Sequence, residues 1–66
     1  MIWFYERGVN HLQCEIRAAL EGSGFELVWE SSDGQSHIER SGDPWVLTTR
    51  RKQLEENLKR DGWQRI

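Results

Sequence analysis

The sequence feature that most constrains the fold is an Asp33-Gly34 pair between two alternating runs of residues, which together span residues 25–40. Asp-Gly in this setting is the strongest short-range signal for a β-hairpin, because a type I′ turn requires positive φ at both central residues. A two-residue loop at this position pairs Trp29 with Ile38. The hairpin residues that this register directs into the core are Leu27, Trp29 and Ile38.

A second turn is predicted at Gly22-Ser23, directly after another alternating run. One face of that run carries Leu12, Cys14, Ile16, Ala18 and Leu20. A two-residue loop pairs Leu20 with Phe25 and Ile16 with Trp29, so apolar side chains meet across the strands. The two turns therefore predict the same buried face and three consecutive antiparallel strands.

The first seven residues are rich in aromatic and β-branched side chains and predict one more strand. If Gly8 opens a two-residue type II′ turn, Tyr5 faces Leu12 and points into the core. The residues that this places on the opposite face are Ile2 and Phe4. A three-residue loop that includes Asn10 would reverse the two faces. We prefer the first alternative, because it sets an aromatic rather than a charged residue against Leu12.

A helix is predicted over residues 44–60. Asp43 is a strong N-cap, and proline at position 44 is favoured at the first helical position. The apolar stripe of this helix is Leu47, Leu54 and Leu58. Arg51 interrupts the stripe, and we expect its aliphatic stem to lie along the sheet while its charge stays in water.

The helix should end in a Schellman motif, with Gly62 just past its end and a contact between Trp63 and Leu58. The elements together predict an α+β fold in a single domain of residues 1–66. It is a four-stranded antiparallel meander, in the order 1-2-3-4, with one C-terminal helix packed on one face. One helix covers one side of such a sheet, so the other side is open to water or to a partner.

The length and the cysteine content of the chain limit how its fold can be stabilised. A chain of 66 residues buries only about 60% of its unfolded surface, so its stability should be marginal. The single cysteine, Cys14, excludes an internal disulfide, and no spacing of Cys and His suggests zinc. We therefore expect no metal and no cofactor, and good local packing with self-association instead.

The distribution of charged and apolar residues indicates where the protein resides and which kinds of partner it can bind. The start of the chain has no basic region followed by a long apolar run, and no stretch approaches the length of a membrane span. We expect a cytoplasmic protein without membrane contact. Residues 1–40 hold seven Asp or Glu against three Arg or Lys, whereas residues 41–66 hold four against six. An acidic sheet argues against a general nucleic-acid binder.

The aromatic start Trp3-Phe4-Tyr5-Glu6-Arg7, the Asp33-Gly34 turn and the ending Asp61-Gly62-Trp63 resemble small uncharacterised bacterial proteins with this ββββα plan. The resemblance covers nearly the whole chain and implies a fold without an activity. The same element order is similar to that of the single-strand-binding transcriptional coactivators, whose dimers bind DNA across the sheet. That likeness is one of architecture, and architecture does not carry function.

Three polar side chains are candidates for a site on the open side of the sheet. The predicted registers place His37, Glu30 and Glu15 in one row there. Two carboxylates beside an imidazole could bind a metal or serve as acid and base. A solvated row of charges is the simpler interpretation, and we prefer it.

Cys14 and His11 are three residues apart on one strand, which directs them to opposite faces. A Cys-His nucleophile pair needs hydrogen-bond contact, so we expect Cys14 to be a small buried apolar residue. The glycine-rich segment Gly22-Ser23-Gly24 lacks the following helix and the lysine of a phosphate loop. It is a hairpin turn.

The candidate interface residues are apolar. The preferred registers place Ile2, Phe4 and Val28 on the open side of the sheet, and Trp45 lies on the helix away from its leucine stripe. Contiguous exposed apolar residues mark interfaces. The alternatives are that the first strand has the opposite facing, and that Trp45 folds back onto an edge strand or the terminal segment.

These observations predict a small interaction module that is not an enzyme. We expect it to form a homodimer through the open sheet face or through an edge strand. The alternative is a single-stranded nucleic-acid binder in which Phe4 or Trp45 stacks on bases. Its phosphate contacts would come from the basic run Arg50, Arg51 and Lys52.

Overall fold

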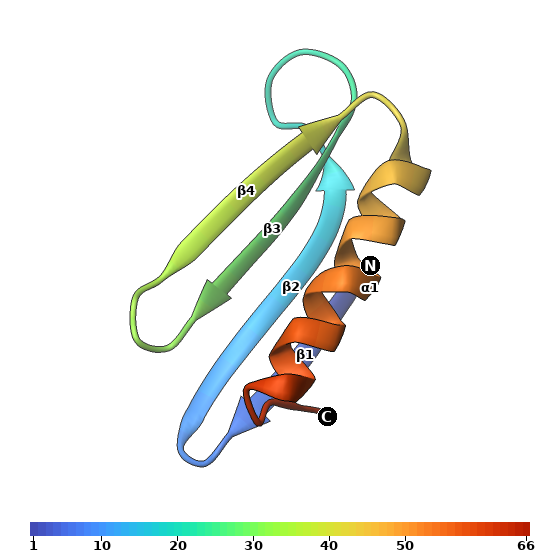
Figure 1. Cartoon of the computed structure of the whole chain (residues 1–66). Helices are drawn as coiled ribbons and strands as arrows, with labels where there is room; N and C mark the ends of the chain where they lie inside the picture. The colour runs from blue at the N-terminus through green and yellow to red at the C-terminus, as the bar shows by residue number, and fades with distance from the viewer.

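A computed structural model describes all 66 residues. Its elements are β1 (Ile2–Arg7), β2 (Asn10–Ala18), β3 (Phe25–Ser31), β4 (Ser36–Ser41), α1 (Pro44–Arg60) and β5 (Gln64–Arg65). The strands form one antiparallel sheet in the order β4-β3-β2-β1-β5, and α1 lies along one face of it (Figure 1). The predicted α+β meander with one packed helix is confirmed. The two-residue strand β5, which pairs with β1, was not predicted.

Both ends of α1 form as predicted. The side chain of Asp43 accepts a hydrogen bond from the Trp45 N–H at 2.9 Å, which satisfies one of the free amides of the first turn. At the other end, the Trp63 N–H donates to the Leu58 carbonyl at 2.9 Å, and Gly62 has a φ of +91°. This is the Schellman motif. It turns the chain back along β1, which is why β5 exists.

The hairpin of β1 and β2 also has the preferred register. Trp3 lies opposite Cys14 and Tyr5 lies opposite Leu12. A type II′ turn requires a positive φ at its first central residue and a negative φ at its second. Gly8 has a φ of +59°, and Val9 does not have a positive φ, so the turn fits this type.

The turn at Asp33-Gly34 is present, but its loop has three residues rather than two. Gly34 has a φ of +92° and Asp33 does not have a positive φ, so the predicted type I′ turn does not form. Instead the Gly34 N–H donates to the Ser31 carbonyl at 3.0 Å. Asp33 Oδ1 accepts the Gln35 N–H at 3.2 Å. A type I turn followed by a glycine in the left-handed region is the common three-residue hairpin loop.

The longer loop shifts the predicted β3–β4 register by one residue, which reverses the faces of β4. Val28 lies opposite Ile38, and Trp29 lies opposite His37. Because neighbouring residues of a strand point to opposite faces, the prediction that Ile38 belongs to the core is wrong. Ile38 is 51% exposed on the uncovered face. His37 and Glu39 lie on the helix side instead.

The predicted β2–β3 register is wrong by two residues. Ala18 rather than Leu20 lies opposite Phe25, and the Ala19 N–H donates to the Gly24 carbonyl at 3.0 Å. Leu20 therefore lies in the loop, exposed to solvent. A shift of two residues keeps every side chain on its predicted face. Leu12, Cys14 and Ile16 are buried as predicted, whereas Ala18 at the end of β2 is exposed.

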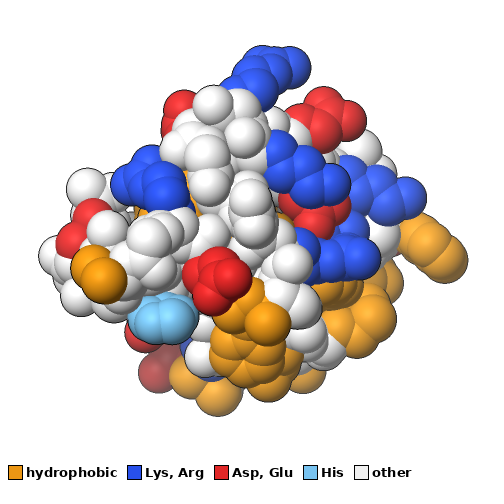
Figure 2. All heavy atoms as spheres, turned by 90° about the horizontal axis from the view of Figure 1, so that it is seen from below, with side chains coloured by type: hydrophobic (Ala, Val, Ile, Leu, Met, Phe, Trp, Pro, Cys, Tyr) orange, Lys and Arg blue, Asp and Glu red, His pale blue; other side chains and the backbone are white.

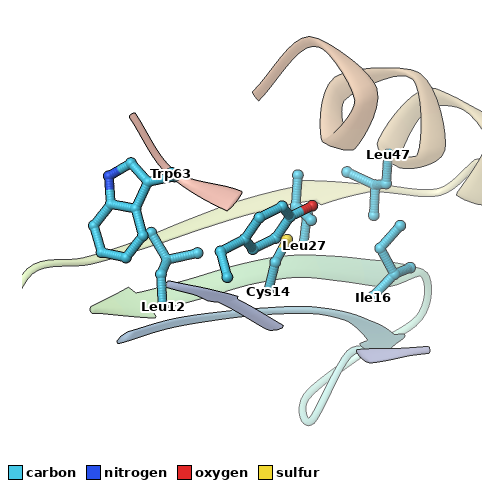
Figure 3. Packing of buried hydrophobic residues seen from close by; sticks show 7 residues of the cluster. Leu12, Cys14, Ile16, Leu27, Leu47 and Trp63 are labelled. Carbon is cyan, nitrogen blue, oxygen red and sulfur yellow. The ribbon is translucent and has the colours of Figure 1, made fainter. Parts of the chain in front are cut away.

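The core lies between α1 and the sheet. Its buried members are Tyr5, Leu12, Cys14, Ile16, Leu27, Leu47 and Trp63. In Figure 3, Leu47 from the helix lies above Ile16 at one end, and Trp63 lies above Leu12 at the other. Leu54 and Leu58 pack against this cluster, so the predicted leucine stripe does face the sheet. No helix of the structure has the length and apolar character needed to cross a membrane.

Candidate functional site

The face of the sheet that α1 does not cover is the first candidate site, and we call it the open face. Four large apolar side chains are half or more exposed on it: Ile2, Phe4, Ile38 and Ile66. Phe4 and Ile66 are neighbours, because the Ile66 N–H donates to the Phe4 carbonyl at 2.9 Å. Seen from below, hydrophobic side chains gather along the lower part of the surface, and most Lys and Arg side chains lie above them (Figure 2).

The predicted interface residues have different surroundings. Ile2 and Phe4 are each 50% exposed on the open face, as expected from their register. Val28 is on that face but only 8% exposed, so it offers little surface to a partner. Trp45 is 76% exposed in the first turn of α1 and does not fold back onto a strand.

Sequence reasoning missed two residues of the open face. Ile38 was misplaced because the loop before β4 is one residue longer than predicted. Ile66 was missed because β5 was not predicted, although the Schellman signal at Gly62 already implied that the chain reverses there.

A charged ladder crosses the open face from β2 to β4. Arg17, Glu26 and Arg40 lie directly opposite one another on three adjacent strands. Glu26 is 3% exposed, and its two carboxylate oxygens lie 2.9 Å from Arg40 Nε and 3.4 Å from Arg17 Nε. The hydrogen bond from Arg40 lowers the pKa of Glu26 despite the opposing effect of desolvation. This part of the open face is therefore ionic rather than apolar.

The predicted polar row does not assemble. Glu15 and Glu30 are on the open face, but His37 is on the helix side, where its ring centroid lies 5.8 Å from that of Trp29. His37 Nε2 is 3.1 Å from a carboxylate oxygen of Glu39. No group of three or more His, Cys, Asp or Glu in the structure is placed to hold a metal ion.

Glu39 joins β4 to the helix. Its two carboxylate oxygens accept hydrogen bonds from Arg50 Nε at 2.8 Å and Arg50 Nη2 at 3.1 Å. The Arg50 guanidinium lowers the pKa of Glu39, and the hydrogen bond with His37 lowers it further. A bidentate pair of this kind fixes the helix over the edge strand.

We expect acid to destabilise the fold through Glu26 and Glu39. Both carboxyl pKa values lie below the ordinary value of 4.5 when the chain is folded. Their contribution to stability is therefore complete above that pH and is lost as the pH falls through the folded-state pKa. Urea midpoints measured between neutral pH and pH values below 4.5 test this. Glu39→Gln should show a smaller loss than the wild type, with Glu30→Gln, an exposed residue without an ion pair, as control. An unchanged loss in Glu39→Gln would contradict the assignment.

A second polar cluster lies between helix and sheet. The Tyr5 hydroxyl donates to Glu55 Oε1 at 3.0 Å and accepts from Arg51 Nη1 at 3.3 Å. The Arg51 guanidinium lies 4.3 Å from the ring centroid of Trp3, and Arg65 Nη1 lies 3.5 Å from Glu55 Oε1. Burial, followed by the contact with Glu55, raises the pKa of Tyr5 to about 12.

The surroundings of Arg51 correct its predicted role. The residue is 6% exposed, so its charge does not extend to water as expected. It occupies the leucine stripe because Trp3, Tyr5 and Glu55 provide an aromatic face, an acceptor and a countercharge. The sequence signal was the position of an arginine within an apolar stripe, but its partners come from β1.

A cavity of about 80 Å³ lies beside this cluster and is lined mainly by apolar side chains, among them Cys14, Leu54 and Leu58. Two N–H groups near it, Trp29 Nε1 and Arg51 Nε, are buried without a hydrogen-bond partner. With a volume of about 80 Å³, this cavity is too small for a substrate of ordinary size.

Cys14 is not a nucleophile in this setting. It is buried, it faces the helix, and His11 points to the opposite face of β2, as predicted. Burial raises the pKa of the Cys14 thiol to about 11. Since only the thiolate reacts, the native thiol is inert at neutral pH.

We therefore expect Cys14 to resist alkylation while the chain is folded. At pH 8 the rate of modification by a thiol reagent should follow the rate of unfolding, and it should rise steeply in urea. A reaction in native buffer as fast as that of free cysteine would contradict the burial of the thiol.

The chain matches no family model, no curated protein and no solved structure.

Proposed function

We propose that this chain is a small non-enzymatic interaction module whose partner is a second copy of itself. The observation that carries the proposal is that four large apolar side chains are exposed on the open face. Ile2, Phe4 and Ile66 lie together at its β1–β5 border, and Ile38 lies at its β4 border. Exposed apolar groups on one uncovered face are the usual sign of an interface.

The small core supports self-association. Only ten of the 66 residues are buried. Complete burial of an Ile or Phe side chain contributes about 1.5–3 kcal/mol relative to full exposure, so a half-exposed side chain still has about 1 kcal/mol to gain. In a domain of this size a few such gains are a substantial fraction of the total stability.

The location that we propose is the reducing cytoplasm, since the single cysteine, Cys14, is a buried free thiol.

Sedimentation of the purified chain from micromolar to millimolar concentration tests the proposal. We expect the mean mass to rise from that of one chain to that of two. Serine substitutions at Phe4 and Ile38 then show which part of the open face takes part. Leu20→Ser is the control, because Leu20 is also a large apolar residue and is even more exposed, but lies in a loop. A monomer at every concentration would exclude self-association.

Nucleic-acid binding has less support from the positions of the residues that it needs. Arg51 is buried against Trp3, and Arg50 is held by Glu39, so Lys52 is the member of the basic run without an ion pair. Trp45 lies on the helix and Phe4 on the opposite side of the sheet. A titration of tryptophan fluorescence with short oligonucleotides at low salt is the corresponding test, and we expect no quenching.

A further inference from the structure

The outer edge of β4 is unpaired along its whole length, and it forms the left border of the sheet in Figure 1. The direction of its backbone groups follows from the alternation of an antiparallel ladder. The Ser31 N–H donates to the Gln35 carbonyl at 2.9 Å, so every second residue from Gln35 onward exchanges hydrogen bonds with β3. The amide and carbonyl groups of Ser36, Ile38 and Arg40 therefore point away from the sheet.

This edge lacks several of the features that normally protect an edge strand from pairing. Proteins protect such strands with proline, with charged side chains and above all lysine, with a bulge or with extreme shortness. β4 has six residues and contains neither proline nor lysine, and its two charged side chains, Glu39 and Arg40, are held in ion pairs with Arg50 and Glu26. Its central outward-pointing residue, Ile38, is half exposed.

We infer that a second copy of the chain adds to β4 as an antiparallel strand, with the two-fold axis at Ile38. The inference rests on the proposed self-association and names its surface and register; of the four exposed apolar side chains of the open face, it places Ile38 in the contact. Ile38 then exchanges both backbone hydrogen bonds with the partner's Ile38, and their side chains meet on the open face. On the helix side, His37 lies opposite the partner's Glu39, and the reverse pair repeats this contact.

Only this register is self-complementary. A two-fold axis at Glu39 would set two carboxylates directly opposite each other, which is unfavourable. An axis at His37 would oppose two imidazoles and place Ile38 against the partner's Ser36. The axis at Ile38 alone gives an apolar pair at the centre and an imidazole opposite a carboxylate on either side of it.

The charged ladder argues against the other way of joining two copies, which is to pack the open faces together. Face-to-face packing would take the guanidinium groups of Arg17 and Arg40 out of water along with the apolar side chains. Desolvation of such ions costs several kcal/mol each unless new partners compensate. Edge pairing leaves Arg17 and Glu26 as they are, sets Arg40 opposite the partner's Ser36, and still brings Ile38 into contact with an apolar partner.

The test compares dimer dissociation constants, measured by sedimentation, for variants of the full chain. Ile38→Pro removes an N–H that points away from β3, so the β3–β4 ladder is retained. The dimer loses two copies of that hydrogen bond, so it should be weaker by about thirtyfold. Phe4→Ser is the matched control, because Phe4 is as exposed as Ile38 but lies on the far side of the sheet, and its dimer should be unchanged.

Two substitutions of opposite charge at His37 test the proposed register between the two copies of β4. His37→Glu should weaken the dimer, because it sets a carboxylate against the partner's Glu39, whereas His37→Lys should preserve it. In a mixture of isotope-labelled and unlabelled chains, we expect a nuclear Overhauser effect between the α-protons of His37 and the partner's Glu39. Residues of a non-hydrogen-bonded pair lie close enough for that contact.

The outcomes separate the inference from the proposed function. A dimer that Ile38→Pro leaves intact and that lacks this intermolecular contact overturns the edge pairing, and the proposed self-association stands. A chain that remains monomeric at millimolar concentration overturns both. If circular dichroism shows that Ile38→Pro does not fold, the two His37 variants and the labelled mixture decide the question.

Discussion

Trp63→Ala is expected to leave much of the chain unfolded at room temperature. Trp63 is a buried core residue, 6% exposed, at the point where the chain leaves α1 and returns along β1. The guanidinium of Arg7 stacks over the Trp63 ring, 4.7 Å from the ring centroid. Replacement of a buried tryptophan by alanine costs about 3–5 kcal/mol. A chain of 66 residues has a total stability of roughly 3–10 kcal/mol, so the loss is comparable with the whole.

Thermal unfolding followed by circular dichroism measures this effect, and Trp45→Ala is the matched control. Trp45 is the same residue type but is 76% exposed on the helix surface. A substitution at such a site changes stability by about 0.5 kcal/mol or less. For a domain of this size 1 kcal/mol corresponds to about 4–8 °C, so Trp63→Ala should melt at least about 10 °C below Trp45→Ala. Similar midpoints would show that Trp63 is not part of the core.

Arg51→Ala should also be strongly destabilising, although most substitutions of arginine on a helix are not. The guanidinium is buried between the Trp3 ring, the Tyr5 hydroxyl and Glu55. Removal of one partner from a buried ionic cluster costs about 3–5 kcal/mol. We expect a value near 3 kcal/mol, because Arg65 remains within 3.5 Å of Glu55 and keeps its charge balanced.

Two further variants identify which property of Arg51 matters. Arg51→Lys keeps the charge but not the planar group that stacks on Trp3, so it should recover less than half of the lost stability. Lys52→Ala is the positional control, since Lys52 is the next residue and is exposed without an ion pair. Urea midpoints of the three variants provide the comparison. Equal midpoints for Arg51→Ala and Lys52→Ala would contradict the buried cluster.

The sequence predicted best those features that depend on a few adjacent residues. The bounds of α1 follow from Asp43, Pro44 and the glycine at position 62, and these signals act within one helical turn. The register of β1 and β2 was predicted because Gly8 and one aromatic–leucine pair, Tyr5 with Leu12, agree on it.

The lengths of two hairpin loops were predicted wrongly. An error of one residue moves side chains to the opposite face of the sheet, whereas an error of two residues does not. At Asp33-Gly34 the sequence signal fits both a two-residue and a three-residue loop, and the side chain of Asp33 favours the longer one by accepting the Gln35 N–H. The resulting one-residue shift moved Ile38 out of the core and His37 off the open face. At Gly22-Ser23 an error of two residues left the faces intact.

The candidate site was predictable only in part for the same reason. Ile2 and Phe4 were identified correctly because they belong to the hairpin whose register was right. The cluster around Arg51 depends on contacts between β1 and α1, at opposite ends of the chain, and no local pattern specifies such contacts. From the sequence, Arg51 could be identified only as a charged residue within the leucine stripe of the helix.

The short strand β5 determines how far an assembly of these chains can grow. A sheet with two bare borders can add copies without limit, as fibres do. Here β5 pairs with Tyr5 and Glu6 of β1, and Ile66 continues this contact at Phe4, so only a short part of the β1 border is left bare. β5 is itself only two residues long and is therefore a poor template for another chain. In the pair that we propose, the two-fold axis uses the remaining border of both copies at once. The assembly then stops at two, with the point-group closure that is typical of soluble dimers.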